Sequence, residues 1–205
     1  ASNLHAFVLD TLLTRDDDTY EWEGALAESW KIAKDKKTFQ FTLRKGLTFH
    51  DGSPITSEDI KFSFDVIFDS DYNTAHRRPY FEGIKEVKIV DERTVIFVAK
   101  TQYYKNFDQA AGLDIISKKF YGNKKNKKRF TKEIIGAGPY KLAKYERGKR
   151  YVLTKFDNWY GHKVQKTNGA NYKSKKIVIK FVKESNVAME MLKKGKLDFI
   201  SMTPE

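Results

Sequence analysis

The stretch from residue 38 to residue 68 constrains the fold most, because it predicts a strand, a tight turn and a capped helix in quick succession. Aromatic and aliphatic residues alternate with polar ones over residues 38–44, which is typical of a strand with one buried face. Asp51-Gly52 then predicts a turn. Thr56, with Asp59 three residues later, predicts the start of a helix. The stretch therefore predicts a β-turn-α unit that buries a core.

The composition limits the classes to which this chain can belong. Its 205 residues, 40% of them hydrophobic, suffice for one large or two small domains. No apolar run approaches the ~18 residues that a bilayer-spanning helix needs. The absence of cysteine excludes thiol catalysis and disulfides, and it is compatible with an oxidising envelope compartment. The chain starts at Ala1 without a recognisable signal peptide, so we expect a mature or shortened chain.

The net charge of +12 raises the question of a nucleic-acid partner. The lysines, however, are scattered over expected strands and loops instead of lining one helix. The densest run, residues 123–129, has no interleaved aromatic residue and is interpreted as a solvated loop, with a docking patch for an acidic surface as the alternative. We therefore expect no nucleic-acid partner.

Further elements follow from local patterns. In the first two thirds of the chain we expect a helix over residues 3–13, an acidic loop over 15–20, a hairpin over 87–97, and short helices over 103–111 and through 120–121.

The last third begins with a sharp break at residues 136–140 (Gly-Ala-Gly-Pro-Tyr). Two alternating strands should follow, at 140–142 and 151–153. The near-continuous apolar run 177–182 predicts a strand covered on both faces. We expect a helix capped by Ser185 and ended by Gly195, and a final strand over residues 197–200.

No arrangement of residues indicates catalysis. The four histidines are far apart and lack metal-binding spacing. Asp16-Asp17-Asp18 lacks the glycine and distal glutamate of a calcium loop, and the 136–139 glycines lack the spacing of a dinucleotide fingerprint. His50, before the Asp51-Gly52 turn, is interpreted as structural or exposed and not as a ligand-binding residue. We therefore expect no catalytic residue, no metal site and no cofactor, and we favour binding over catalysis.

Several of these motifs together resemble the extracellular solute-binding proteins, family 5, of peptide and nickel ABC importers. The similarity is carried by Leu-Ala-Glu-Ser-Trp at 26–30, the strand at 38–46, the turn and helix at 49–62, and Gly-Ala-Gly-Pro-Tyr at 136–140, which has alanine where the family usually has threonine. Asn-Trp-Tyr-Gly at 158–161 and Gly-Lys-Leu-Asp-Phe at 195–199 extend it along nearly the whole chain. The polar loop 163–172 is similar to the branch that binds oligopeptides, murein peptides or peptide antibiotics.

The resemblance implies a mixed α/β fold of the type II periplasmic-binding-protein kind, present in part. Residues 1–23 and 136–205 would form part of the first, hinge-side domain, and residues 24–135 an inserted β-rich lobe. Family members are much longer and carry a third domain, so the resemblance implies that this chain is a fragment lacking the opposing wall of the cleft. Ligand binding by the fragment alone should then be weak or absent.

The function implied is capture of a peptide between two lobes and its delivery to the permease subunits of an ABC transporter in the membrane. The protein would act in the periplasm or at the extracellular face of the cell envelope, without making or breaking bonds. Dipeptide, oligopeptide, murein peptide, metal chelate and oligosaccharide all remain open as ligands. The exposed edges of a fragment could also pair with a second copy.

Seven residues are candidate ligand contacts. Ser201 and Met202 follow the last expected strand at the hinge, where the family often lines its cleft. Ala137 and Gly138 lie on a loop whose exposed backbone could approach a ligand. Arg77, Arg78 and Tyr80 lie in an irregular segment of the inserted lobe, where relatives contribute an aromatic contact, and arginine suits a peptide carboxylate.

Two readings from other classes compete with the importer reading: a basic nucleic-acid-binding module, and a sensor that reuses the same fold. Salt-dependent retention on heparin or DNA distinguishes the nucleic-acid module from the binding protein.

Overall fold

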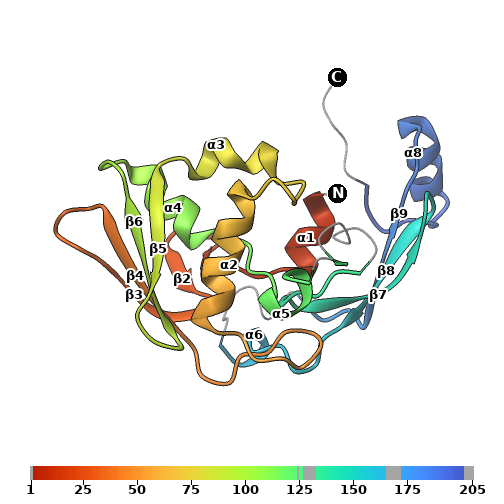
Figure 1. The fold of residues 1–205 in the computed structure, drawn as a ribbon. Coiled ribbons are helices and arrows are strands. Elements are labelled where there is room, and N and C mark those ends of the chain that lie inside the picture. Colours follow the sequence, from red (N-terminus) through yellow and green to blue (C-terminus); the bar gives the residue numbers. More distant parts are fainter. Residues whose placement is uncertain (1, 124, 127–132, 165–171, 201–205) are drawn as a thin grey trace.

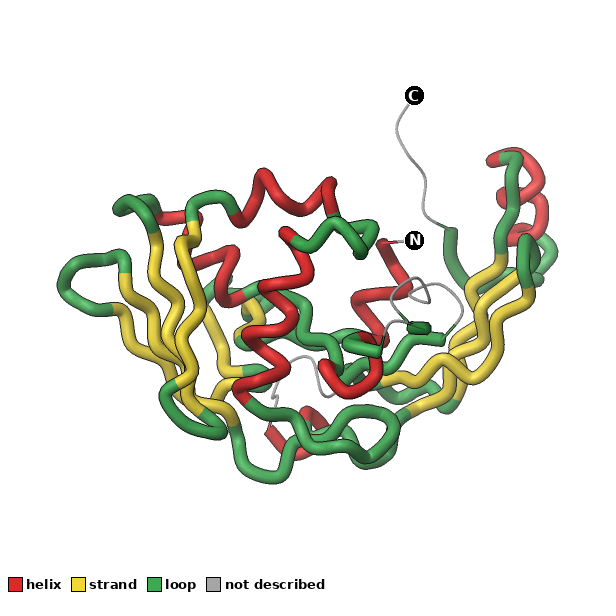
Figure 2. Tube along the Cα trace, viewed as in Figure 1, coloured by secondary structure: helices red, strands yellow, loops and turns green. Residues whose placement is uncertain are grey.

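The computed structural model describes residues 2–123, 125–126, 133–164 and 172–200. In Figure 1, a four-stranded sheet and its helices lie on one side of the molecule and a three-stranded sheet on the other, with α1 and α5 between them. Figure 2 shows the strands in these two groups, with most of the helical residues between or beside them. The elements are α1 (Ser2–Val8), β1 (Leu13–Arg15), β2 (Trp22–Gly24), β3 (Ala27–Ile32), β4 (Thr38–Leu43), α2 (Ser57–Phe68), η1 (Ala75–Arg77), α3 (Arg78–Phe81), β5 (Ile84–Ile89), β6 (Thr94–Ala99), α4 (Tyr104–Ala111), α5 (Lys118–Tyr121), β7 (Tyr140–Glu146), β8 (Arg150–Lys155), α6 (Gly161–Val164), β9 (Lys176–Lys180) and α8 (Ser185–Lys193).

The four-stranded sheet is antiparallel in the order β3-β4-β6-β5. Strand β4 alternates half-buried and buried residues, so the expected strand with one buried face is confirmed. The buried face packs aromatic rings together: Phe41 makes an edge contact with Phe97 (5.6 Å between ring centroids) and stacks on Phe107 of α4 (5.9 Å). Helices α2 and α4 therefore close the core against this sheet.

Helix α2 begins where the sequence predicts. The Thr56 backbone N–H donates to the Asp59 carboxylate (2.9 Å), and the two residues form a capping box. The other Asp59 oxygen accepts from the Lys118 backbone N–H (2.8 Å), so the same carboxylate also ties α2 to α5. Burial raises the pKa of Asp59, against the opposing effect of these hydrogen bonds.

The three-stranded sheet, β7-β8-β9, is less completely covered. Its first hairpin turns at Gly148 (φ +69°), and Tyr151 and Leu153 of β8 are buried. Strand β9 alternates exposed and half-buried residues, so the strand is confirmed but its expected coverage on both faces is wrong for the described residues. None of the α8 residues is buried either.

Three other boundaries differ from expectation. Helix α1 ends at Val8, because Asp10 forms a β-bridge with Ile115 and the chain continues into β1. Ser185 is the first residue of α8, and the N-cap is Glu184, without a capping side-chain hydrogen bond. Residues 197–200 form no strand, although Gly195 (φ +65°) follows the helix end as predicted.

Two clusters of buried apolar side chains hold these parts together. The larger fills the space between the four-stranded sheet, α2 and α4. The second joins Leu4 and Val8 of α1 to Tyr140 and Leu153 of the three-stranded sheet, and it includes Tyr121. Since Tyr121 falls within 24–135, this part shares a core with its flanks, and the division into hinge-side domain and inserted lobe stays a prediction. None of the helices in the described ranges combines the length and hydrophobicity needed to cross a bilayer.

Candidate functional site at the junction of the sheets

A half-buried carboxylate lies where α1, the 113–117 loop and the 158–161 turn meet. Asp10 Oδ2 accepts hydrogen bonds from Trp159 Nε1 (3.0 Å) and from the Tyr160 hydroxyl (2.9 Å). Its Oδ1 accepts from the Thr11 backbone N–H (2.9 Å), and its carbonyl accepts from the Ile115 N–H (2.9 Å). One residue near the N-terminus thus connects segments about 100 and 150 positions away in sequence.

The environment changes the protonation of this group. Burial raises the pKa of Asp10 to about 6, although the hydrogen bonds from Trp159, Thr11 and Tyr160 favour the charged form. Burial likewise raises the pKa of Tyr160 well above its usual value, and the nearby Asp10 carboxylate adds to that effect. Tyr160 therefore stays protonated throughout the physiological range, and its hydroxyl donates a hydrogen bond to the Asp10 carboxylate.

His50 forms a second set of hydrogen bonds at this junction, and we call the Asp10 and His50 hydrogen bonds the two clasps. Its Nδ1 accepts from the Gly136 backbone N–H (3.3 Å), so Nε2 carries the proton and donates to the Gly138 carbonyl (2.9 Å). Its own N–H donates to the Gly136 carbonyl (2.9 Å), and its ring meets the edge of Phe156 at 5.0 Å. Burial lowers the pKa of His50 to about 4, so the ring is neutral near pH 7. The structural interpretation of His50 is confirmed.

The glycines of the 136–140 segment are required by close packing. A Cβ on Gly136 would lie 1.9 Å from the Val8 carbonyl oxygen, and one on Gly138 would lie 2.6 Å from the Leu9 oxygen. The Gly138 N–H donates to the Val8 carbonyl (3.0 Å), and Ala137 is buried. The expectation that this backbone is exposed is therefore wrong: its polar groups already bind α1 and His50. A ligand role for Ala137 and Gly138 stays a prediction.

Aromatic rings surround the junction beside α1. Tyr172 meets the rings of Phe7 (6.5 Å), Tyr140 (6.0 Å) and Trp159 (5.2 Å), each edge to face. The Tyr140 hydroxyl donates to the Ser174 carbonyl (2.9 Å). These contacts connect the three-stranded sheet to α1, so the junction is held by apolar packing as well as by polar clasps.

The two candidate arginines, Arg77 and Arg78, both have partners within the protein. Arg77 Nη1 forms an ion pair with Asp114 Oδ2 (2.6 Å). Arg78 donates to the Ile67 (3.0 Å) and Phe68 (3.4 Å) carbonyls at the C-terminal end of α2, where a cation is favourable. Tyr80, by contrast, is 65% exposed on α3. Of these three residues, Tyr80 is the one with a side chain open to a partner.

Asp114 also connects this cluster to the junction, because Ile115 beside it bridges Asp10. His5 of α1 lies near Arg77 and Asp114; burial lowers its pKa, Arg77 acts in the same direction, and Asp114 opposes them. The Arg77–Asp114 pair and the Gly138 loop therefore both lie beside α1.

The remaining candidates lie elsewhere. Ser201 and Met202 lie outside the described residues, as do most of the 163–172 loop and part of the basic run 123–129. A pocket of about 200 Å³ is lined by residues 133–135 and 142–145, away from the Asp10 network. It borders a range that the structure does not describe, so we assign it no role.

The arrangement favours a structural brace over a reaction centre. The hydrogen bonds of Asp10 and His50 come from backbone N–H, ring N–H and hydroxyl donors. Within the described ranges, no group of three or more His, Cys, Asp or Glu residues is placed to hold a metal ion. Asp16 of the acidic loop also has a structural role. Its carboxylate accepts from the Asp18 (3.0 Å) and Thr19 (2.7 Å) backbone N–H groups and so caps its own turn.

No local sequence pattern singles out Asp10. The available signal is weak: an acidic residue between Leu9 and Leu12, which the structure buries. Its partners Trp159 and Tyr160 were noted only as a family motif. No local pattern joins positions 150 residues apart.

The chain belongs to the bacterial extracellular solute-binding proteins, family 5, since the sequence model described as "Bacterial extracellular solute-binding proteins, family 5 Middle" matches residues 21–205. The mixed α/β fold expected from the resemblance is confirmed with it, as solved structures of this family superpose on the chain.

Three similar proteins illustrate the sequence identity and coverage of these matches. Protein XP55 of Streptomyces lividans is 29% identical over 199 residues, covering 96% of this chain and 34% of its own length. The dipeptide-binding protein of Escherichia coli is 34% identical over 170 residues, covering 72% of this chain and 31% of its own. The crystal structure of NikZ from Campylobacter jejuni in complex with Ni(L-His) is 27% identical with a TM-score of 0.79, covering 94% of this chain and 37% of that one. The chain thus spans about a third of the length of the relatives it matches.

Proposed function

We propose that the protein is the substrate-binding component of an ABC importer, which captures a peptide in a cleft between lobes and delivers it to a membrane permease. The observation that carries this proposal is the family match over residues 21–205. The names of several relatives, among them a dipeptide-binding protein and the oligopeptide-binding protein AppA of Bacillus subtilis, favour a peptide ligand. The family description favours action outside the cytoplasm, in the periplasm or at the extracellular face.

In this proposal the junction is the rigid base on which one wall of the cleft is built. Binding proteins that close around a ligand need stiff lobes and a few residues that absorb the movement. The Asp10 and His50 clasps stiffen the meeting point of α1 with segments 136–138 and 159–160. We propose that Ser201 and Met202 lie toward the cleft, and that Ala137 and Gly138 contribute indirectly, by setting the path of the chain.

The inserted-lobe candidates differ in what a ligand would have to displace. A peptide carboxylate would compete with Asp114 for Arg77, and with the α2 carbonyls for Arg78. Tyr80 offers a ring and a hydroxyl that are largely exposed. We therefore propose Tyr80 as the primary contact of the three and Arg77 as a secondary one.

The names of several relatives describe binding, and no constellation in the described residues suggests a reaction, so we propose a non-catalytic role. Nucleic-acid binding and sensing are the competing functions, but no contact described above favours either. A metal chelate is a further candidate ligand, since the similar protein NikZ was solved with Ni(L-His).

Native mass spectrometry of the complete gene product, purified without refolding, tests the proposal. We expect additional mass that acid treatment releases as peptides, identifiable by sequencing. The variant Tyr80→Ala should lower peptide occupancy, whereas Tyr20→Ala, a matched change at an equally exposed tyrosine (73% exposed), should not. Recovery of a metal chelate, a sugar or nucleic acid in place of peptide would contradict the peptide assignment.

A further inference from the structure

One end of the four-stranded sheet gathers three separate segments. The turn between β3 and β4 covers residues 33–37, and the Ala99 N–H donates to the Lys37 carbonyl (2.7 Å). The Lys100 N–H donates to the Gly83 carbonyl (2.8 Å), which brings the start of β5 to the same place. Figure 1 shows the β3–β4 turn projecting from the body of the protein beside this end of β6.

These segments carry an excess of positive charge. Residues 33–37, 82–85 and 100–105 contain six lysines and two acidic residues, Asp35 and Glu82. All six lysines are exposed, and among the described residues none of them is in an ion pair with a carboxylate. We name this surface the lysine end; it consists of Lys34, Lys36, Lys37, Lys85, Lys100 and Lys105.

The acidic residue in the turn, Asp35, forms no ion pair with the described lysines beside it, although its charge acts on Lys37. The Asp35 carboxylate accepts from the Lys37 (2.9 Å) and Thr38 (3.0 Å) backbone N–H groups and from the Thr38 hydroxyl (2.8 Å). It is therefore committed to forming the turn, while the three lysine ammonium groups of the turn extend into solvent.

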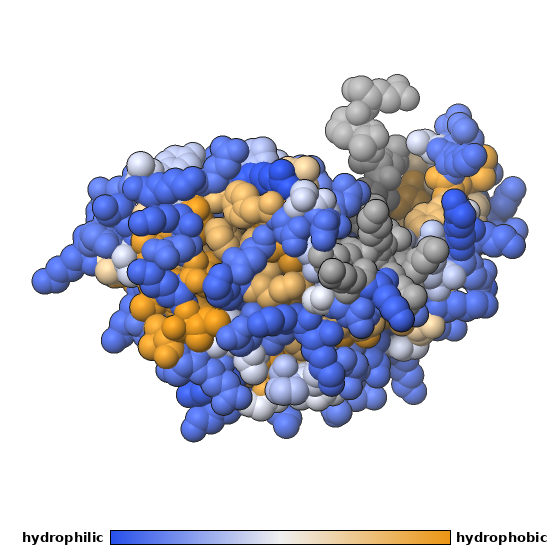
Figure 3. All heavy atoms as spheres, viewed as in Figure 1, coloured by the Kyte–Doolittle hydropathy of each residue, from blue (hydrophilic) through white to orange (hydrophobic). Residues whose placement is uncertain are grey.

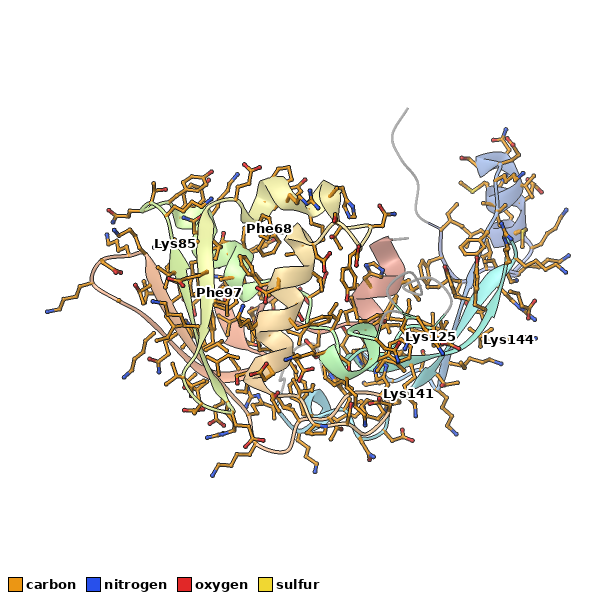
Figure 4. The ribbon with its side chains drawn as sticks, viewed as in Figure 1. Phe68, Lys85, Phe97, Lys125, Lys141 and Lys144 are labelled. Atoms are coloured by element: carbon orange, nitrogen blue, oxygen red, sulfur yellow. The ribbon has the colours of Figure 1, made fainter. Side chains whose placement is uncertain are left out.

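The opposite end of the same sheet is different. There Arg93 pairs with Glu28 (3.3 Å), and nearby Lys118 pairs with Glu58 (2.7 Å). In Figure 3 the surface at the lysine end is hydrophilic, whereas hydrophobic residues gather at the other end of β5, where Ile89 and Val90 are exposed. Figure 4 places Lys85 at the lysine end and Phe97 in the interior of the sheet. Of the two ends of the four-stranded sheet, the lysine end thus carries the excess of positive charge.

The turn itself does not require this charge. Lys36 has φ +51°, a left-handed conformation in which glycine and asparagine are favoured over lysine. Local stability therefore gives no reason for lysine at this position.

Two tyrosines adjoin the lysines at the start of α4. Tyr103 is 48% and Tyr104 71% exposed, with their ring centroids 5.0 Å apart. The Lys105 ammonium lies 5.9 Å from the Tyr104 ring centroid. Exposed tyrosine beside lysine is typical of surfaces that meet the headgroup region of a bilayer, because the ring is apolar and the hydroxyl polar.

We propose that the lysine end docks on an anionic phospholipid surface. Juxtamembrane lysines are attracted to anionic headgroups, and the two tyrosines add contacts that salt does not screen. The exposed tyrosines beside the lysines favour a bilayer over a nucleic acid, because binding to phosphates alone would be fully screened by salt. This role is independent of which solute the protein binds.

Vesicle co-sedimentation of the full chain tests the proposal. Vesicles of phosphatidylcholine with 30% phosphatidylglycerol are compared with pure phosphatidylcholine at low and high salt. We expect binding to the anionic vesicles alone, weakened by salt. The variant Lys34→Glu/Lys36→Glu/Lys37→Glu should lower the association constant by roughly 100-fold or more. The matched control Lys173→Glu/Lys175→Glu/Lys176→Glu, which makes the same change in net charge at exposed lysines near the other sheet, should retain binding.

Two further variants separate the lysine end from general effects. Lys36→Asn should weaken vesicle binding about fivefold while leaving the urea midpoint unchanged or higher, because asparagine suits the left-handed turn. Tyr104→Ser should remove binding that persists at high salt.

The proposal fails under any of three outcomes. The control triple variant loses as much binding as the lysine-end variant, the wild type does not bind anionic vesicles at low salt, or the lysine end binds duplex DNA or an acidic peptide more tightly than vesicles.

Discussion

The four-stranded and three-stranded sheets are both antiparallel, but they differ in how completely their faces are covered. Strands β4 and β6 bury Phe41 and Phe97 against α2 and α4, whose apolar faces complete the core. Strand β9 and helix α8 bury no residue fully. The first region therefore has its own sealed core, whereas the second depends on β8 and on the junction. We expect unfolding free energy to be concentrated in the first region.

A matched pair of phenylalanines tests this difference most strongly. Phe41→Ala removes a ring that is fully buried and touches Phe97 and Phe107, so it should cost about 3–5 kcal/mol in the free energy of unfolding. Phe181→Ala removes a ring that is 42% exposed and touches Tyr151, so it should cost about 1 kcal/mol or less. Urea unfolding followed by circular dichroism measures both. Equal costs would show that the three-stranded region is as well packed as the other.

The two clasps, at His50 and Asp10, should change the free energy of unfolding with pH in opposite directions. The pKa of His50 is lowered from 6.5 to about 4, so the folded state binds fewer protons than the unfolded state between these values. Its contribution is present above pH 6.5 and is lost as the pH falls through about 4; it amounts to about 3 kcal/mol. His50→Gln should remove this dependence, so the difference in unfolding free energy from wild type should change by about that amount between pH 4 and 7.

Charged groups near His50 act in opposite directions: Lys141 lowers its pKa and Asp51 raises it. Lys141→Met therefore provides a control that should shrink the pH dependence without abolishing it. A His50→Gln curve parallel to the wild type would contradict a neutral, buried ring.

Asp10 has the reverse sign, because its folded pKa, about 6, lies above its ordinary value of 3.8. The folded state binds more protons in this window, so stability falls as the pH rises from about 4 to 6, by about 3 kcal/mol. In the wild type this fall offsets much of the gain from His50. Asp10→Asn should therefore expose a steeper rise in stability with pH than the wild type shows.

Asp65→Asn, the same change at a surface carboxylate paired with Lys61 on α2, supplies the control for the substitution itself. Amide hydrogen exchange also shows whether, in the Asp10→Asn variant, the two sheets open independently of each other. If both sheets still exchange together, the brace is weaker than we infer.

Much of the four-stranded region was predictable, because its signals are local. The alternation around Phe41, the capping residues Thr56 and Asp59, and the hairpin that contains Phe97 each appear within a few residues. The same holds for the break at Gly136, where two glycines and a proline interrupt the chain.

The errors arise where a distant contact overrides the local pattern. Helix α1 ends early because Asp10 pairs with Ile115, more than 100 residues away. The apolar run of β9 suggested two covered faces, but coverage depends on which elements pack on the strand. Gly138 was recognised as part of a break, yet its use by Val8 and His50 could not be read from neighbouring residues.

The smallest expected difference concerns the two helix starts. Thr56 and Asp59 form a capping box at α2, so Thr56→Ala should cost about 1 kcal/mol in the free energy of unfolding. Ser185 lies inside the first turn of α8 and its neighbour Glu184 is the N-cap, so Ser185→Ala should change stability by about 0.5 kcal/mol or less. Thermal and urea unfolding of the pair measure this. A larger cost at Ser185 would restore the capping role that the sequence suggested, and it would mean that α8 is bound to the three-stranded region more firmly than its exposed surface indicates.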